Sequence, residues 1–224
     1  MLSAILLAAG KSRRFLKRQS KVLSGICAKP VIYYSLSVLN KHPKVDEIIV
    51  VASLKNIKEI ALIIRKYKIG KAVKVVLGGG ERKYSVYNGL KVLSPDTDYV
   101  LIHDGARPFI NSKMISSSIL AARKHRAAVV GVPEKHTIKE IGRRKAIKTL
   151  NRESLWEIQT PQVFKKDIIL KAYQNISGYN VTDDAMLVER LGIRPAVVLG
   201  SYSNIKITTP EDLTIAEAIL KEGL

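Results

Sequence analysis

A turn of small residues followed by a group of cations is the first place in the sequence where chemistry is expected. Ala8-Ala9-Gly10 allows a ligand to approach the backbone closely, and the glycine permits a sharp turn. Backbone N–H groups in such a turn bind phosphate oxygens. Cations follow before residue 22, among them Arg13, Arg14, Lys17, Arg18 and Lys21. The pattern predicts a polyphosphate site, although a flexible solvated loop would have the same composition.

The same loop lacks the two best-known nucleotide-binding signatures. It contains neither G-x-G-x-x-G nor G-x-x-x-x-G-K-[ST], so neither a dinucleotide fold nor a P-loop ATPase is predicted. The sequence also has no G-x-S-x-G nucleophile elbow, and its four histidines have no metal-ligand spacing. The cations and small residues of this loop instead indicate a phosphoryl or nucleotidyl transferase.

Other polar or small residues stand where further strands are expected to end. Asp104 follows an apolar run and could bind ribose hydroxyls, join a metal site or simply cap a turn. The three glycines 78–80 could form a plain loop or let a flat base pack on the backbone near Ser85. Lys206 is expected near the edge of the sheet.

The elements that must position these residues alternate between strands and helices. Such alternation predicts an α/β fold with a mostly parallel sheet, in which ligands bind beyond the carboxyl ends of the strands. The expected strands are 3–9, 47–52, 73–77, 99–103, 127–132, 196–199 and 204–207. The expected helices are 30–39, 57–67, 82–93, 112–125, 167–175 and 183–191, with a further helix starting at Thr209-Pro210-Glu211-Asp212.

The alternation stops in the middle of the chain. Residues 134–164 contain HTIKEI and KAIKTL on either side of GRR, which predicts two short antiparallel strands joined by a tight turn. This arm is either an ordinary surface hairpin or an element for dimerisation or closure. No repeat or linker interrupts the sequence, so one domain over residues 1–224 is expected.

The composition adds limits on location and partners. Among 224 residues, 38 Lys and Arg oppose 19 Asp and Glu, which gives a net charge of +19 and suggests anionic partners. The cations are scattered and aromatic residues make up only 6%, so nucleic-acid binding is not expected as the main role. No apolar run is long enough to span a bilayer, and the apolar N-terminus is expected to form a strand rather than a signal peptide. The single cysteine, Cys27, predicts a cytoplasmic protein without an intrachain disulfide, and Cys27 and Trp156 are expected in the core.

Taken together, six segments resemble the 2-C-methyl-D-erythritol 4-phosphate cytidylyltransferase family. In order they are LLAAGKSRR…K, GGGERKYSVYNGL, HDGARPF, NRESLWEIQTPQVF, NVTDDAMLVERLG and NIKITTPEDL, and they cover nearly the whole chain. The resemblance implies transfer of a cytidylyl group from CTP to a sugar-alcohol phosphate, with release of pyrophosphate. It also implies a Rossmann-like nucleotidyltransferase fold, a Mg²⁺ requirement and a homodimer formed through the arm.

The resemblance also implies roles for individual residues. Arg14 and Lys21 would stabilise the charge that builds up at the α-phosphate. The residues that would hold the substrate are Arg152, Lys206, Asp104, Thr160, Thr182, Arg107 and, from the other subunit's arm, Thr137. The residues that would hold the nucleotide are Ala8, Ala9, Gly10, Gly79, Ser85 and Gly105. The metal ligands are not implied by any matching motif.

Three positions depart from the family pattern, and one related family is close. Ser12 stands where glycine is usual, Ser20 where proline usually precedes the lysine, and Gly80 where an acidic residue is usual. The closest alternative is ribitol-5-phosphate cytidylyltransferase, which shares the first loop and the C-terminal segment. The sequences HDGARP and VTDDA favour the methylerythritol enzyme.

Overall fold

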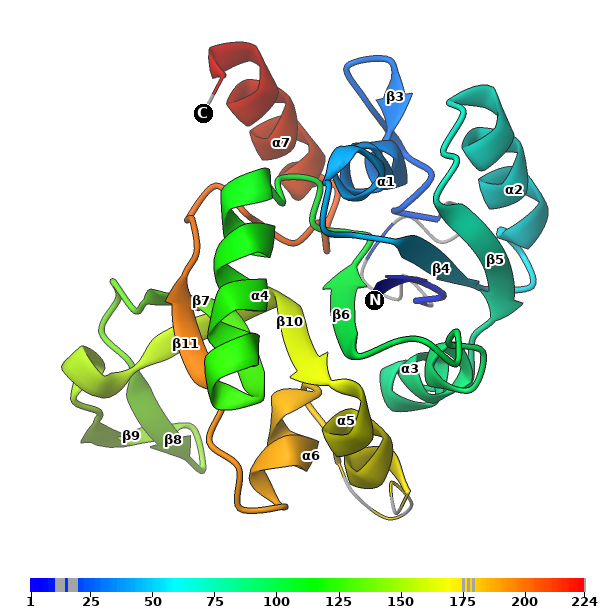
Figure 1. The fold of residues 1–224 in the computed structure, drawn as a ribbon. Helices are drawn as coiled ribbons and strands as arrows, with labels where there is room; N and C mark the ends of the chain where they lie inside the picture. The colour runs from blue at the N-terminus through cyan, green and yellow to red at the C-terminus, as the bar shows by residue number, and fades with distance from the viewer. Residues whose placement is uncertain (11–14, 16–19, 175, 177, 179, 224) are drawn as a thin grey trace.

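The computed structural model describes residues 1–10, 15, 20–174, 176, 178 and 180–223. Within them, seven strands form a central sheet in the order β11-β7-β10-β6-β1-β4-β5 (Figure 1). These strands are β1 (Leu2–Ala8), β4 (Glu47–Ala52), β5 (Ala72–Leu77), β6 (Tyr99–Asp104), β7 (Ala127–Pro133), β10 (Trp156–Lys165) and β11 (Ala196–Leu199). All neighbouring pairs are parallel except those of β10, which runs antiparallel to both β6 and β7. The predicted α/β fold is therefore confirmed.

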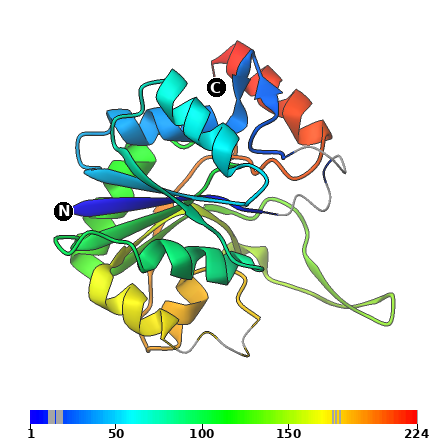
Figure 2. The same ribbon diagram turned by 90° about the vertical axis from the view of Figure 1, so that its right-hand side faces the viewer.

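Helices cover both faces of the sheet (Figure 2). One face packs against α1 (Val31–Lys41), α2 (Ile57–Lys66), α4 (Ser112–His125) and α7 (Glu211–Glu222). The other packs against α3 (Arg82–Leu90), α5 (Lys166–Tyr173) and α6 (Ala185–Glu189). Every residue of β1 and β4 is buried. A strand covered on both faces needs a continuous apolar run, which is why these two strands were recognisable in the sequence.

The order of the strands creates a crevice beside β1. The chain goes from β1 outward to β4 and β5, then returns to place β6 on the other side of β1. The connections therefore leave β1 in opposite directions, which is the arrangement at which open α/β sheets bind ligands. The three segments that follow β1, β5 and β6 meet at this crevice.

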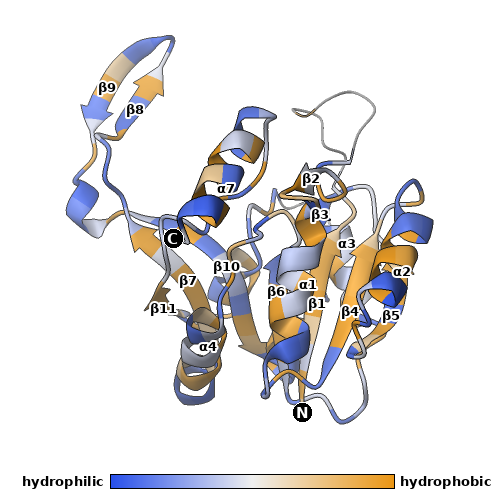
Figure 3. Cartoon of the chain, turned by 90° about the horizontal axis from the view of Figure 1, so that it is seen from above, coloured by the Kyte–Doolittle hydropathy of each residue, from blue (hydrophilic) through white to orange (hydrophobic). Residues whose placement is uncertain are grey.

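The arm is shorter than the range 134–164 expected for it. A hairpin of β8 (Lys139–Gly142) and β9 (Lys145–Thr149) projects from the sheet, followed by the 3₁₀ turn η1 (Arg152–Ser154) (Figure 3). The remainder of the range is β10, which lies between β6 and β7. Its run WEIQTPQVF therefore belongs to the core sheet, where most of its residues are buried.

Other expectations from the sequence also need correction. Residues 204–207 form no strand, because the carbonyl of Asn204 accepts from the Arg107 side chain and the backbone of the segment bonds to Ala106 O through the Ile207 N–H. Cys27 is exposed rather than buried, since it lies with φ +46° in the tight turn between β2 (Gly25–Ile26) and β3 (Lys29–Pro30). Trp156 is 40% exposed, at the start of β10 next to the arm.

Candidate functional site

A cavity of about 450 Å³ opens at the crevice beside β1. It is bounded by the segments that follow β1, β5 and β6 and by the segment that precedes α7. The predicted site residues that line it are Ala9, Gly10, Lys21, Gly79, Ser85, Asp104 and Lys206. The structure therefore brings together residues that are up to 197 positions apart in the sequence.

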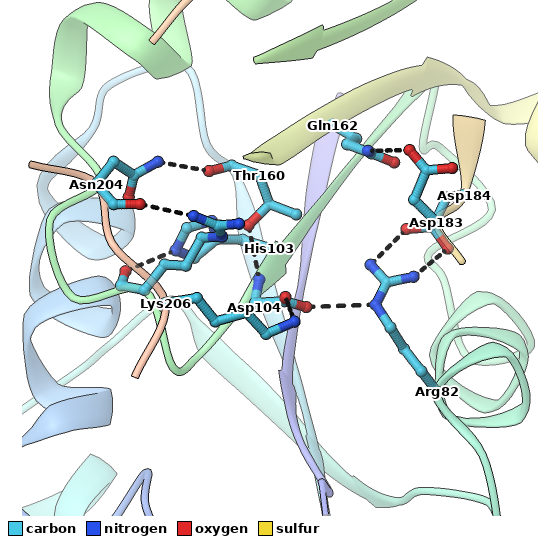
Figure 4. Close-up of polar contacts among 10 residues, drawn as sticks. Arg82, His103, Asp104, Thr160, Gln162, Asp183, Asp184, Asn204 and Lys206 are labelled. Atoms are coloured by element: carbon cyan, nitrogen blue, oxygen red, sulfur yellow. Dashed lines mark hydrogen bonds and ion pairs between the residues drawn. The ribbon is translucent and has the colours of Figure 1, made fainter. Parts of the chain in front are cut away.

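Asp104 is the central acidic group of the cavity, and it bonds to two cations (Figure 4). Its Oδ2 lies 2.5 Å from Lys206 Nζ, and its Oδ1 lies 3.4 Å from Arg82 Nε. Burial alone would raise the pKa of the Asp104 carboxyl, but the charges of Arg82 and Lys206 outweigh burial and hold that pKa well below its usual range. Asp104 is therefore a permanent anion that orients both cations.

Arg82 connects Asp104 to a second, fully buried carboxylate. Its Nη1 and Nη2 donate to Asp184 Oδ1 and Oδ2 at 2.9 and 2.7 Å, a bidentate pair (Figure 4). The Tyr173 hydroxyl donates to the same Asp184 Oδ1. Burial, followed by the charge of Asp184, raises the pKa of Tyr173, so the phenol stays protonated. These contacts join α3, α5 and α6 to the wall of the cavity.

A chain of buried hydrogen bonds supports the backbone of Asp104 on the side away from the cavity. Because the Arg107 carbonyl only accepts, His103 Nε2 must donate to it at 3.1 Å, and His103 Nδ1 then accepts from the Thr160 hydroxyl at 2.9 Å. The Thr160 oxygen in turn accepts from the Asp104 N–H at 3.1 Å. Burial lowers the pKa of His103 to about 4, so the ring is neutral and keeps this tautomer at neutral pH. His103 is fully buried beside Asp104.

Thr160→Val should therefore destabilise the fold without removing volume. The methyl group would leave the Asp104 N–H and His103 Nδ1 buried without their partner, which costs about 1–3 kcal/mol. Urea unfolding should show this loss in the free energy of unfolding, while Thr214→Val, at an exposed position of α7, should change it little. Equal stability of the two variants would show that the chain of bonds does not hold Asp104.

Arg107 and Asn204 hold the segment that carries Lys206. Arg107 Nη1 donates to the Asn204 carbonyl at 2.7 Å, and Asn204 Nδ2 donates to Gln159 Oε1 and to the Thr160 carbonyl. Both side chains are buried, so Arg107 lies beneath the cavity rather than in its lining. Their contacts fix the path of the chain two residues before Lys206.

The side of the cavity that is predicted to hold the nucleotide is built from close backbone contacts. A Cβ on Gly78 would lie 2.4 Å from Ala9 Cβ, and one on Gly79 would lie 2.3 Å from Tyr84 Cβ, so neither position has room for a side chain. Ser85 Oγ accepts from the Gly79 N–H at 3.1 Å and donates to the Glu81 carbonyl at 3.2 Å. The glycine loop is therefore packed closely against Ala9 and Tyr84, and its backbone is held by Ser85.

Two further residues from the prediction lie just below this surface. Ala8 is the buried last residue of β1, and its carbonyl faces inward to Asn56. Gly105 N–H donates to the Leu7 carbonyl at 2.9 Å, and a Cβ on Gly105 would lie only 3.0 Å from that oxygen. Both positions support the cavity without being among its lining residues.

Some residues named from the sequence are not brought to the cavity. Thr137, Arg152 and Thr182 are exposed and do not line it. Arg152 Nη1 donates to the Lys135 carbonyl at 3.0 Å, which fixes it at the root of the arm. Arg14 lies outside the described residues, so its position relative to Lys21 stays a prediction.

Sequence reasoning missed the part of the site built around Arg82. Arg82 follows the glycines 78–80 at the start of a helix, a position at which a cation could have been noticed. Asp184 lies in VTDDA, which helped to choose between families but received no role. Tyr173, the third member of this group, has no feature in the sequence that indicates its contact.

The carboxylates of the cavity limit how a divalent metal could bind. Among the described residues, no group of three or more His, Cys, Asp or Glu side chains is placed to hold a metal ion. Asp104 and Glu81 are the acidic residues that line the cavity in the described part of the chain, and Asp104 already bonds to Arg82 and Lys206. Such a donor set suits a cation held chiefly by phosphate oxygens rather than by a protein cage.

No helix in the described part of the chain is long and apolar enough to cross a membrane.

Comparison with known proteins gives a consistent result over the whole chain. Residues 2–222 match the family of 2-C-methyl-D-erythritol 4-phosphate cytidylyltransferases. The chain is 45% identical to the protein of that name from Caldanaerobacter subterraneus subsp. tengcongensis, with 99% of each chain covered. It is 47% identical to the one from Clostridium botulinum strain Langeland, with 98% of this chain and 97% of the other covered.

Solved structures agree with this result. The crystal structure of 4-diphosphocytidyl-2C-methyl-D-erythritol synthase from Anaerococcus prevotii superposes with a TM-score of 0.87 at 34% identity, covering 98% of both chains. The Thermus thermophilus cytidylyltransferase superposes with a TM-score of 0.80 at 27% identity, over 97% of this chain and 98% of the other. The fold, the cavity and these similarities lead to one conclusion: the chain belongs to the 2-C-methyl-D-erythritol 4-phosphate cytidylyltransferase family.

Proposed function

We propose that the protein transfers a cytidylyl group from CTP to 2-C-methyl-D-erythritol 4-phosphate. An oxygen of the sugar phosphate attacks the α-phosphorus of CTP, the bond from that phosphorus to the bridging oxygen of the β-phosphate breaks, and pyrophosphate leaves. The products are 4-diphosphocytidyl-2-C-methyl-D-erythritol and pyrophosphate. The observation that carries the proposal is the meeting of Lys21, Lys206 and Asp104 with the small residues Ala9, Gly10 and Gly79 in one cavity.

The cytidine would bind on the narrow side of the cavity. The surface made by Ala9, Gly79 and Ser85 leaves room for a flat ring against the backbone, and its limited size favours a pyrimidine over a purine. The pair of Ser85 and Gly79 holds this backbone in place. Asp104, an anion between two cations, is suited to accept hydrogen bonds from sugar hydroxyls.

The cations would stabilise the reacting phosphate. Attack by one phosphate on another concentrates negative charge around the α-phosphorus, and a fixed positive charge stabilises the transition state more than the ground state. Lys21 lines the cavity and fits this role, and we assign the same role to Arg14. The attacking phosphate is already ionised at neutral pH, so the reaction requires no general base.

We infer that Mg²⁺ enters with the triphosphate. The carboxylates of Asp104 and Glu81, which line the cavity, could add ligands to the ion. A bound Mg²⁺ would neutralise charge on the leaving pyrophosphate. A nucleotide substrate and a single exposed cysteine both suit the cytoplasm, where we place the enzyme.

The acceptor side of the site requires a second subunit in this proposal. Thr137 and Arg152 lie at the root of the arm and outside the cavity of their own chain. We propose that the arm of each subunit reaches the other subunit of a homodimer and delivers these two residues to its cavity. There they would act with Lys206 and Thr182 on the sugar phosphate, while Thr160 and Arg107 would hold Asp104 and the Lys206 segment in place from beneath the cavity.

Arg152→Ala should then raise the KM for the sugar phosphate while changing the KM for CTP little, because the lost cation would contact only the acceptor. A mixing experiment tests whether Arg152 acts across the dimer. If it does, a mixed dimer of Arg152→Ala and Lys21→Ala subunits contains one site with neither change. Random mixing should then restore roughly a quarter of the wild-type rate. No restoration, from a mixture that light scattering shows to be dimeric, would place Arg152 in its own subunit's site.

The reaction itself is tested by pyrophosphate release. Purified protein with CTP and Mg²⁺ should release pyrophosphate when 2-C-methyl-D-erythritol 4-phosphate is added, and much less with ribitol 5-phosphate. Replacing CTP with ATP provides the control for the base. Release with ribitol 5-phosphate alone would contradict the proposed acceptor, and no release from a folded protein that binds CTP would contradict the activity.

A further inference from the structure

Asn56 stands at the start of α2 but does not cap this helix. At an N-cap, an asparagine side chain normally accepts from the N–H two or three residues later. Asn111 does this for α4, where its Oδ1 accepts from the Met114 N–H at 2.9 Å. Asn56 makes no such bond to α2 and is only 1% exposed. Its buried amide therefore bonds to groups outside α2.

The hydrogen bonds of Asn56 lead away from its own helix. Its Oδ1 accepts from the N–H and the hydroxyl of Ser53, at 2.7 and 2.9 Å. Its Nδ2 donates to the Ala8 carbonyl at 2.9 Å and to Ser20 Oγ at 3.3 Å. Both hydrogens of the amide nitrogen thus have acceptors, and the carbonyl oxygen has two donors.

The two groups on Nδ2 flank the cation-rich loop. Ala8 is the last residue of β1, and Ser20 is the residue before Lys21. The Ser20 carbonyl also accepts from the N–H groups of Leu23 and Ser24, so Ser20 begins the turn that carries Lys21. One buried amide therefore connects the end of the first strand to the start of the lysine turn.

We propose that Asn56 is a positioning residue for Lys21. Its two donor bonds set the distance between the end of β1 and the turn that carries Lys21. The end of β1 leads into the nucleotide side of the cavity, and Lys21 lines the same cavity. The inference rests on the proposed function, in which Lys21 acts on the reacting phosphate. Asn56 itself does not line the cavity, so its effect passes through Ser20.

Turnover and stability separate this role from a purely structural one. A displaced lysine would weaken stabilisation of the transition state, so kcat should fall about tenfold in Asn56→Ala, with the KM for the sugar phosphate changed less than about twofold. Ser20→Ala removes only one contact and should lower kcat about threefold. If both changes break the same contact, the double variant should be no slower than Asn56→Ala alone.

The matched control is Asn111→Ala, which removes an asparagine from the N-cap of another helix. It should lower the melting temperature and leave kcat unchanged, because Asn111 does contact its own helix and does not line the cavity. The inference is overturned if Asn56→Ala keeps kcat within twofold of wild type. It is equally overturned if Asn111→Ala loses as much kcat as Asn56→Ala. Should Asn56→Ala fail to fold, Ser20→Ala is measured instead, and a kcat of Ser20→Ala within twofold of wild type overturns the inference.

A labelling measurement reads the position of Lys21 without using turnover. Acetic anhydride treatment followed by peptide mass spectrometry gives the protection of Lys21 by saturating CTP. Wild type and Asn111→Ala should show strong protection, and Asn56→Ala and Ser20→Ala should lose part of it. A wild-type protein that protects Lys21 but releases no pyrophosphate would refute the proposed reaction and leave the positioning testable. Absence of protection in wild type, or equal protection in all variants, would overturn the inference.

Discussion

Lys21→Ala should lower kcat about 10²–10³-fold while the protein stays folded. Removing one preorganised charge from the place where transition-state charge develops typically has an effect of this size. Lys21 is well placed for it, since it lines the cavity together with Asp104 and Lys206. Lys206 is paired with Asp104 at 2.5 Å, so it does not replace Lys21 at the α-phosphate without moving.

Steady-state pyrophosphate release, with both substrates varied, measures this effect. Lys58→Ala is a suitable control, because it removes one cation from an exposed position of α2 and should leave kcat unchanged. Thermal unfolding of both variants should match wild type closely. Turnover of Lys21→Ala within a few-fold of wild type would show that the reacting phosphate is stabilised by other groups.

The strands that position the site were predictable because burial on both faces leaves a clear pattern. β1, β4 and β6 are short apolar runs, and the residues after β1 and β6, together with the glycines after β5, line the cavity as expected. Parallel strands place their carboxyl ends at one edge of a sheet, so reading those residues gave Lys21, Asp104 and Ser85. Lys206 was also placed correctly, although it follows an irregular segment rather than a strand.

The errors occurred where tertiary contacts override local pattern. The run Trp156–Lys165 follows the arm and has no strict alternation, so its pairing with both β6 and β7 was not evident from the sequence. The segment 204–207 has the apolar residues of a strand, but its extended path is held by side chains such as Arg107. Arg82 and Asp184 are 102 positions apart, and they meet only because the fold places α3 and α6 on the same face of the sheet.

The charge of the protein acts at two levels in this site. The net charge of +19 makes the protein as a whole attractive to anions. Inside the cavity the balance is different, because Arg82 lies between two carboxylates and Lys206 is paired with one of them. These pairs fix the positions of charges before the substrates arrive, so little reorganisation is needed during the reaction.

Arg82→Met should lower the free energy of unfolding by about 3–5 kcal/mol at pH 7, more than Thr160→Val does. Removing one partner of a buried ion pair leaves an uncompensated charge, which costs this much. Asp184 is fully buried and would lose both of its bonds to Arg82, and Asp104 would lose one of its two cations. Lys165→Met, which breaks the exposed pair with Asp167, should change stability little.

The pH dependence identifies the cause of this loss. In the wild type the pKa of Asp104 is held below the value of about 3.9 typical of an unfolded chain. Its stabilising contribution is therefore complete above pH ~4 and is lost as the pH falls through the folded-state pKa. In Arg82→Met that pKa rises, so the difference in unfolding free energy between wild type and variant should be largest at neutral pH and shrink below pH ~4. Urea unfolding from pH 7 to pH 3 measures it.

A second substitution distinguishes lost charge pairing from lost packing. Asp184→Asn keeps the size of the side chain and its contact with Tyr173 but removes the buried charge. If Arg82→Met is unstable because Asp184 is left uncompensated, the double variant Arg82→Met/Asp184→Asn should be more stable than Arg82→Met alone. Two results together would mean that Arg82 acts through its packed aliphatic stem. The double variant would be no more stable than Arg82→Met, and the stability difference between wild type and Arg82→Met would be the same at pH 7 and pH 3. Asp104 would then owe its position to Lys206 and to the hydrogen bond between its backbone and Thr160.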